Sequence, residues 1–336
     1  LLVDGMSNDG SREIMEEYCN RYSFIKMHDN ESRFIPQAMN IGVASSVGEV
    51  IIRMDAHASY PDDYVSTLVS TLKRTNADNV GSPIVTKVLN ENDKTLAIRE
   101  VLCDKVGVGN SLFRVGVDEE TEVDTVPFGC WRRSAFVKYG LFDERLRRNQ
   151  DIEFNKRIKR MGGKILLVPD TYCIYWARES FKELARNNFQ NGKWNILTVY
   201  YTGVRDSLSL RHFVPFLFLL SLFLPLLLSA VCPPSVWLTV APLFLYVAVI
   251  GQRSLLLSKK KKLNPVYLFL SFAVLHFSIG LFSYRCRCRI GIHRGCRRTL
   301  NTGVHVGTVV IADIDHIVST LHGSGERLPE APADSL

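Results

Sequence analysis

The sequence predicts an α/β domain with a mostly parallel sheet, followed by a membrane region. Short runs of β-forming residues alternate with stretches of helical apolar spacing, and polar motifs follow several of the strands directly. The membrane region is predicted because the apolar surplus is concentrated between residues 213 and 284. With 336 residues and 46% hydrophobic content, the chain can bury a domain core and still have apolar sequence left over.

The alternation of strands and helices begins at the first residue. Strands are predicted at 1–3, 24–26 and 50–54, and helices at 11–22, 35–43 and 64–74. Ser11 is the predicted N-cap of the first helix. In such sheets ligands bind beyond the carboxyl ends of the strands, and Asp4 and Asp55 both lie at such ends. Because Leu1 already lies in a strand, we expect an N-terminal piece to be missing from the sequence.

The α/β domain is predicted to cover residues 1–205, and a membrane region residues 206–284. Spans are expected near 213–231, 236–252 and 265–284, each close to the roughly 20 residues that cross a bilayer. Buried core helices are the alternative interpretation.

The positive charge also points to a membrane. The net charge is +7, but the basic residues lie beside the apolar runs, as at a membrane surface, so no nucleic-acid partner is expected. The positive-inside rule places the α/β domain in the cytoplasm. It also leaves the basic tail, 285–336, outside, against the same rule. Either the third span is not a simple crossing, or the tail is aberrant or disordered.

Two polar motifs lie at strand ends. Asp55-Ala56-His57 closes a strand, and a carboxylate and an imidazole two residues apart can both reach a divalent cation. A capping Asp with a surface His is the alternative. The stretch "DGMSNDGS", residues 4–11, has glycines that permit close backbone approach, with acids and hydroxyls to accept hydrogen bonds. It could equally be a polar turn.

Further candidates lie later in the chain. Asp151 opens a predicted helix, where it could cap the helix or act as a base. In "QNGKW", Gln190 to Trp194, a cation and an indole could hold a diphosphate and a sugar, or anchor the chain at a membrane interface. Trp131 could line an acceptor pocket by stacking on a sugar, or pack in the core.

In this order, the motifs of residues 1–205 resemble those of family 2 glycosyltransferases with the GT-A fold. Within that family the chain looks most like succinoglycan-type exopolysaccharide glucosyltransferases, in which the metal motif takes the Asp-Ala-His form. The resemblance implies a membrane-bound inverting enzyme of the bacterial cytoplasmic membrane. It would move a sugar, with glucose expected, from a UDP-sugar to a lipid-linked saccharide acceptor during exopolysaccharide or cell-surface polysaccharide biosynthesis. Other polysaccharide-assembly proteins are possible partners.

The resemblance also implies roles for individual residues. On the donor side, Asp4 would bind the nucleobase with Asp9 in support, and Arg33 and Asn40 would lie beside the nucleotide. Asp55 and His57 would hold Mn²⁺ or Mg²⁺ at the diphosphate. Asp151 would be the base, and Gln190, Lys193 and Trp194 look like a variant of the Gln-x-x-Arg-Trp motif.

The chain departs from the family pattern at three places. Gln150 stands where Glu is usual, Lys193 replaces an Arg, which removes bidentate phosphate contact, and the first strand with its own acid is absent. Three alternatives therefore stay open: a processive polysaccharide synthase, a polyprenyl-phosphate glycosyltransferase, and a non-catalytic membrane scaffold that keeps a degenerate nucleotide-sugar fold.

Overall fold

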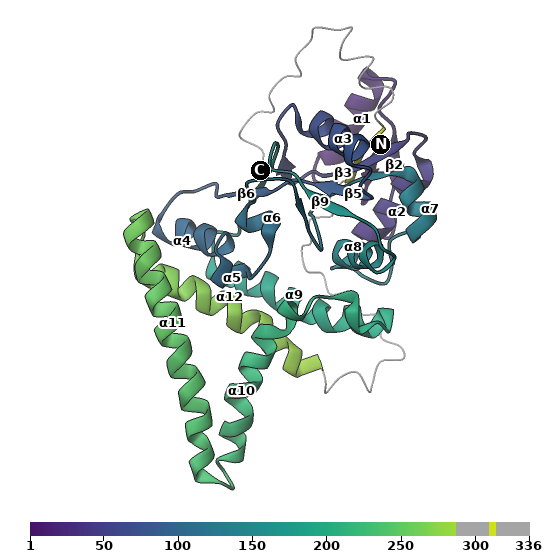
Figure 1. Cartoon of the computed structure of the whole chain (residues 1–336). Helices are drawn as coiled ribbons and strands as arrows, with labels where there is room; N and C mark the ends of the chain where they lie inside the picture. The colour runs from purple at the N-terminus through teal and green to yellow at the C-terminus, as the bar shows by residue number, and fades with distance from the viewer. Residues whose placement is uncertain (287–308, 314–336) are drawn as a thin grey trace.

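The computed structural model describes residues 1–286 and 309–313, which form an α/β domain joined to a helical region (Figure 1). The main sheet has eight strands in the order β2-β1-β11-β3-β8-β5-β9-β7. Their bounds are β1 Leu2–Asp4, β2 Met27–Asp29, β3 Val50–Asp55, β5 Asn79–Gly81, β7 Thr121–Glu122, β8 Cys130–Arg132, β9 Ile165–Leu167 and β11 Val309–Asp313.

Most strands of this sheet run in one direction. β1 is parallel to β2, and β5 is parallel to β9. β1 and β3 are both antiparallel to β11, and β3 and β5 are both antiparallel to β8, so all five share one direction. The prediction of a mostly parallel sheet is only partly correct, because the β1–β2 and β5–β9 pairs are parallel while the other neighbouring pairs of the main sheet are antiparallel. β1 and β3 direct their carboxyl ends to the same edge.

Helices cover both faces of the sheet. They are α1 Ser11–Arg21, α2 Ile35–Ser45, α3 Tyr64–Thr75, α7 Arg133–Tyr139 and α8 Gln150–Arg160. Neighbouring residues of β3 show the two faces, because alternate side chains of a strand point to opposite sides. Ile51 packs in one core cluster, with residues of α2, α7 and α8, whereas Ile52 packs in another, with residues of α3.

A small second sheet connects the domain to the helical region. It consists of β4 Ala58–Ser59, β10 Cys173–Trp176 and β6 Ile84–Lys87. The segment that follows β6 folds into α4 Asp93–Leu102, α5 Lys105–Val108 and α6 Leu112–Val115.

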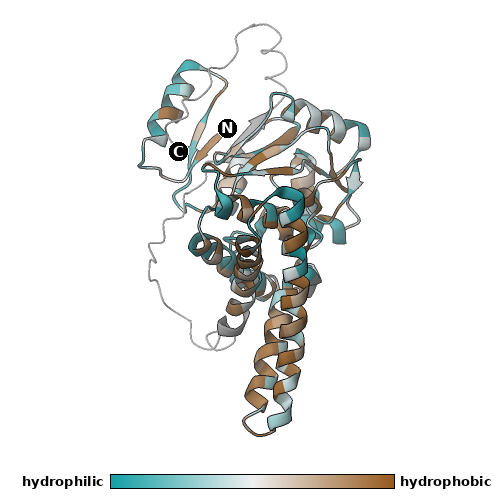
Figure 2. Ribbon diagram, turned by 90° about the vertical axis from the view of Figure 1, so that its left-hand side faces the viewer, coloured by the Kyte–Doolittle hydropathy of each residue, from teal (hydrophilic) through white to brown (hydrophobic). Residues whose placement is uncertain are grey.

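The helical region contains α9 Phe181–Thr202, α10 Val214–Leu228, α11 Trp237–Lys261 and α12 Pro265–Cys286. α10 and α11 form a hairpin that projects from the body of the molecule (Figure 1). Its surface is largely apolar, as the brown ribbon in Figure 2 shows. Arg211–Leu228 and Pro233–Lys261 are long and apolar enough to cross a membrane.

The third predicted span differs from the other two. Its helix, α12, packs against α4, α9, α10 and α11, and its Leu268 and Phe272 are fully buried. The apolar part, Pro265–Leu281, is shorter than the two candidate spans. Within 1–286 and 309–313, two helices therefore qualify as spans where the sequence predicted three.

Three sequence predictions need correction. The second strand lies at Met27–Asp29 rather than at 24–26. The first helix is capped by Gly10, at φ 92°, and Ser11 is its first helical residue. The tail contributes β11, which pairs between β1 and β3, so a disordered tail is wrong for residues 309–313. The remainder of that prediction, 287–308 and 314–336, lies outside the described residues.

Candidate active site

The end of β3 carries a buried ion pair. Arg53 and Asp55 are two residues apart on one strand, so their side chains share a face. Nε of Arg53 donates to Oδ1 of Asp55 at 2.7 Å, and Nη2 donates to Oδ2 at 2.8 Å. Their exposed fractions are 5% and 4%. Burial lowers the pKa of Arg53, but the charges of Asp55 and then Asp151 raise it above its usual value. The guanidinium is therefore charged and paired with the Asp55 carboxylate.

Aromatic side chains hold this pair in place. The hydroxyl of Tyr60 accepts the backbone N–H of Asp55 at 2.8 Å, and its ring centroid lies 4.7 Å from that of Tyr64. The Arg53 guanidinium lies 5.7 Å from the centroid of the Phe128 ring. Phe128 has φ 59°, a left-handed conformation that costs a non-glycine residue about 1–3 kcal/mol. Arg53 was missing from the sequence candidates, although a charge inside the run Val50–Asp55 was a visible signal.

Asp151 lies in the first turn of α8, half-buried, with its Oδ1 accepting the N–H of Ile152 at 2.8 Å. Asn149, two residues before Asp151, has φ 60°. Its Nδ2 donates to Oδ1 of Asn195 on α9 at 3.1 Å. The position of Asp151 is thus tied to α9. Gln150 is 4% exposed, and its Oε1 has no hydrogen-bond partner within the described part of the chain.

Asp4 closes β1 and is fully buried. It accepts the hydroxyl of Ser7 at 2.6 Å and pairs with Nη1 of Arg12 at 3.0 Å. Arg12 also reaches Asp29, at the end of β2, at 2.8 Å. Asp9 is exposed and accepts the N–H of Ser11 at 3.2 Å. The motif of residues 4–11 is therefore a loop organised around the Asp4 carboxylate at the same sheet edge as Asp55.

The other donor-side candidates divide into two kinds. His57 is exposed in the turn after β3, and Arg33 is exposed with φ 61° before α2. Asn40 is 9% exposed. Its side-chain amide makes two hydrogen bonds to the backbone of Phe142: Oδ1 accepts the N–H, and Nδ2 donates to the carbonyl, each at 3.0 Å. In this structure the Asn40 amide fixes α2 to the loop that contains Phe142, and its predicted nucleotide contact stays a prediction.

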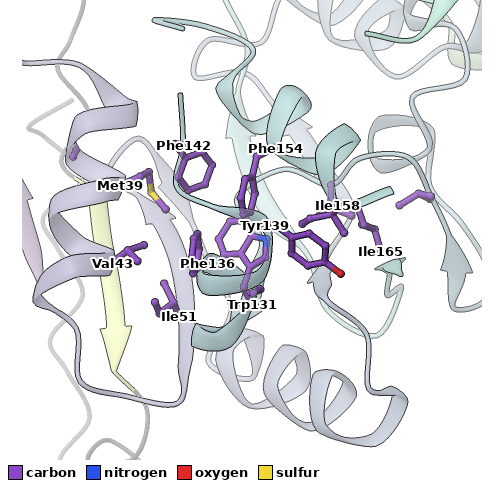
Figure 3. Packing of buried hydrophobic residues seen from close by; sticks show 14 of the residues in the cluster. Met39, Val43, Ile51, Trp131, Phe136, Tyr139, Phe142, Phe154, Ile158 and Ile165 are labelled. Atoms are coloured by element: carbon purple, nitrogen blue, oxygen red, sulfur yellow. The ribbon is translucent and has the colours of Figure 1, made fainter. Parts of the chain in front are cut away.

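The two tryptophans assigned to the acceptor are also structural. Trp131 is 2% exposed within an aromatic cluster, edge-on to Phe136 and Phe154 (Figure 3). Trp194 is 9% exposed and stacks on Tyr201 with centroids 6.4 Å apart. Stacking on a sugar requires an accessible ring face, which neither tryptophan presents in this structure. Gln190 and Lys193 lie half-buried on α9.

The donor set at the end of β3 limits what could hold a metal ion. In the described ranges, no three His, Cys, Asp or Glu side chains gather into a metal-binding group. Asp55 and His57 supply one carboxylate and one imidazole. Mg²⁺ and Mn²⁺ in phosphate-transfer sites often take one or two protein ligands and complete their shells with phosphate oxygens and water. Because both Asp55 oxygens already accept N–H groups of Arg53, an ion at this place would have to be held mainly by a bound diphosphate.

Comparison with known proteins identifies the domain. Residues 1–140 match the family model described as glycosyl transferase family 2. The succinoglycan biosynthesis protein ExoA of Rhizobium meliloti is 30% identical over 195 residues, which cover 57% of this chain and 58% of that protein. The chain thus spans less than two thirds of this relative's length.

Two further matches extend over more of the chain. A dolichyl N-acetyl-α-D-glucosaminyl phosphate 3-β-D-2,3-diacetamido-2,3-dideoxy-β-D-glucuronosyltransferase of Methanococcus voltae is 24% identical over 88% of this chain and 86% of its own. A crystal structure of S. aureus TarS aligns with 85% of this chain and 81% of its own, at 15% identity and a TM-score of 0.42. Residues 1–140 are therefore similar to the catalytic domain of family 2 glycosyltransferases, and the curated relatives support that similarity.

Proposed function

We propose that the chain is a membrane-bound inverting glycosyltransferase that moves a sugar from a UDP-sugar to a lipid-linked saccharide acceptor in surface polysaccharide assembly. One observation supports the proposal most directly: the buried Arg53 guanidinium pairs with Asp55 at the carboxyl end of β3, the edge of the sheet where ligands bind in folds of this kind. The names of the relatives support the acceptor class, since one acts on a lipid-linked sugar phosphate and another serves succinoglycan biosynthesis.

The chemistry follows from the placement of these groups. The bond between the anomeric carbon and the diphosphate breaks, and UDP leaves with the bonding electrons. The Asp4 loop holds the nucleoside, and the fixed charge of Arg53 favours the diphosphate as its negative charge increases. A Mn²⁺ or Mg²⁺ ion on Asp55 and His57 supplies further charge stabilisation when it is bound.

Asp151 acts on the acceptor. The acceptor hydroxyl attacks the anomeric carbon from the face opposite the diphosphate, and its proton passes to the Asp151 carboxylate. A positioned base of this kind contributes about 10²–10⁴-fold to the rate. A single displacement inverts the anomeric configuration. Because Gln150 is neutral, the Asp151 carboxylate has no acidic neighbour at position 150 to share the role.

The apolar hairpin supplies the membrane attachment that such an acceptor requires. Its exposed side chains are apolar along both arms, and its turn, 229–236, contains no charged residue. Basic residues lie where the arms join the domain, at Arg211, Arg253 and Lys259–Lys262. By the positive-inside rule this end faces the cytoplasm, so the α/β domain is cytoplasmic and the hairpin enters the bacterial inner membrane.

A UDP-release assay tests the proposal. The full chain, purified in detergent, is incubated with single UDP-sugars, Mn²⁺ or Mg²⁺, and a bacterial lipid extract. We expect UDP release with at least one sugar, a short lipid-linked product, and loss of release on adding EDTA. Donor binding without any release would favour the scaffold, and a long polymer without added lipid would favour the processive synthase. Either result would contradict the proposal.

A further inference from the structure

Three arginines with no assigned role lie at the junction of the α/β domain and α9. Arg114 is on α6, Arg148 precedes α8, and Arg178 precedes α9. Nη1 of Arg148 donates to Oδ1 of Asn187 at 3.1 Å and to Oδ1 of Asn191 at 2.7 Å, both on α9. We refer to Arg114, Arg148 and Arg178 as the arginine cluster.

Tyr175 of β10 packs against one member of the cluster, because the Arg114 guanidinium lies 5.1 Å from the centroid of its ring. Arg178 follows Tyr175 by three residues on the segment that leads to α9. Burial lowers the pKa of Arg148, and the positive charge of Arg178 lowers it further.

The cluster lacks a negative partner. Across residues 1–286, no recorded ion pair joins Arg114, Arg148 or Arg178 to an acidic side chain, whereas Arg53 and Arg253 each pair with an aspartate. The partners of Arg148 are neutral amides, and Nη1 of Arg114 is buried without a hydrogen-bond partner. Partly buried cations without counter-charges are costly, so an anionic ligand would relieve both the desolvation and the mutual repulsion.

The position of the cluster indicates which anion it would bind. Arg148 is three residues before Asp151, on the segment that α9 holds through its amides. α9 in turn packs along α12, and Figure 1 shows it between the α/β domain and the apolar hairpin. An anion at the cluster would thus lie near the base, on the membrane side of the domain.

We propose that the arginine cluster binds the phosphate or diphosphate that links the acceptor's sugar to its lipid. Guanidinium groups suit this ligand, because their planar N–H donors match phosphate oxygens in pairs. The inference rests on the proposed function for the acceptor class. The donor diphosphate has the same chemistry, but its place in the proposed function is at Asp55 and Arg53.

Ligand binding to the full chain in detergent tests the cluster separately from activity. The probes are farnesyl diphosphate, farnesol and UDP, and the variants are Arg148→Gln and Arg178→Gln. Arg145→Gln is the matched control, because Arg145 is an exposed arginine of the same segment that pairs with Asp143. Arg178 is exposed and precedes α9, so its substitution leaves the fold intact.

We expect the unmodified chain to bind farnesyl diphosphate more tightly than farnesol. Each cluster variant should weaken farnesyl diphosphate binding about tenfold or more, as for the loss of a hydrogen bond to a charged group, while UDP affinity stays within about twofold. The control should bind all three probes like the unmodified chain.

Three results would overturn the inference: equal affinity for farnesyl diphosphate and farnesol, cluster variants that bind like the control, or a parallel loss of UDP binding, which would assign the cluster to the donor. Cluster-dependent binding without any UDP release would leave the anion site intact and count against the proposed function alone. If the chain releases UDP but the cluster variants bind farnesyl diphosphate like the control, the proposed function stands and the anion site is overturned.

Discussion

At the level of single residues, the pair Arg53 and Asp55 connects stability with chemistry. Both side chains are buried, and each carboxylate oxygen accepts one guanidinium N–H. A buried pair of this kind contributes little relative to apolar residues of the same size, but removing one partner leaves the other charge uncompensated. Asp55 therefore depends on Arg53 for its counter-charge in the fold.

Arg53→Met should lower the free energy of unfolding by about 3–5 kcal/mol, because it strands the Asp55 carboxylate in the core. The double variant Arg53→Met/Asp55→Leu should recover much of that loss while remaining inactive. Thermal unfolding of the full chain in detergent measures both. Equal destabilisation in the single and double variants would show that the pair is not the source of the effect.

The sequence could identify Asp4, Asp55 and Asp151 because each lies at the end or beginning of an element that its neighbours define. It could not separate them from Asn40 and Trp131, whose roles depend on burial. Asn40 meets Phe142 across about a hundred residues of chain, and Trp131 lies among aromatic rings from α7 and α8. Contacts of this range leave no local pattern in the sequence.

At the level of elements, α9 presents two different faces. Asn187, Asn191, Asn195 and Thr198 recur at helical spacing and bond to Arg148 and Asn149 beside the catalytic segment. The face that contains Gly192 packs on α12, where a Cβ at position 192 would lie 2.0 Å from the carbonyl oxygen of Ile279. α9 thus couples the position of Asp151 to the helical region.

Gly192→Ala should disturb this packing, because the backbone of α12 cannot move as a side chain can. We expect a destabilisation of about 1–3 kcal/mol, as for overpacking, together with reduced transfer. Gly251→Ala is the matched control, since a Cβ there meets no atom within 4 Å and alanine favours the helix. Thermal unfolding and UDP release report both effects. A Gly192→Ala chain that behaves like the control would rule out the close approach.

Asp124 connects the α/β domain to the start of the hairpin. It accepts the hydroxyl of Ser209 at 2.7 Å and Nη2 of Arg211 at 3.2 Å. Burial raises the pKa of Asp124, but the Ser209 hydrogen bond and the positive charges of Arg211 and Lys156 lower it below its usual value. A carboxyl whose pKa is depressed by folding stabilises the fold fully above its unfolded pKa, about 3.9.

Below that pH the contribution of Asp124 is lost as the pH falls through the depressed folded-state pKa. Acidification from pH 5 to pH 3 should therefore loosen the hairpin base, which limited proteolysis near residues 203–211 would detect. Asp124→Asn should already show the loosened cleavage pattern at pH 7 and change less between pH 5 and pH 3. An unchanged pH response in the variant would exclude Asp124 as the titrating group.

The elements that the sequence predicted well are those with a strong local pattern, such as β3 with its buried apolar run. The second strand lies three residues later than predicted, because its position is set by pairing with β1 and not by the apolar Phe24-Ile25. α12 was taken for a span because a helix that is apolar on all sides looks the same whether protein or lipid surrounds it. The β-branched run at Val309–Ile311 was a signal for β11 within a tail set aside as irregular.

At the level of the whole molecule, the placement of β11 bears on the predicted topology. Both arms of the hairpin join the body at one end, and α12 docks on α9 and α4 (Figure 1). We expect residues 309–313 to lie on the same side of the membrane as the α/β domain, because β11 pairs with β1 and β3.

A reporter fused after residue 336 tests this topology. We expect a fluorescent protein to be active there and alkaline phosphatase to be inactive, as for a cytoplasmic end. Three full crossings would give the opposite pattern. Cys232, exposed at the hairpin turn, provides an internal control. It should react with a membrane-permeant maleimide, whereas the buried Cys130 and Cys173 should not.

The most direct measurement of the central claim compares donor binding with sugar transfer in Asp151→Asn, using Asp170→Asn, at an exposed aspartate, as the control. If Asp151 is the base, the variant binds UDP-sugar with the affinity of the unmodified chain, and single-turnover transfer falls about 10²–10⁴-fold. Transfer at the unmodified rate, or a loss of donor binding that accounts for the lost transfer, would contradict this assignment.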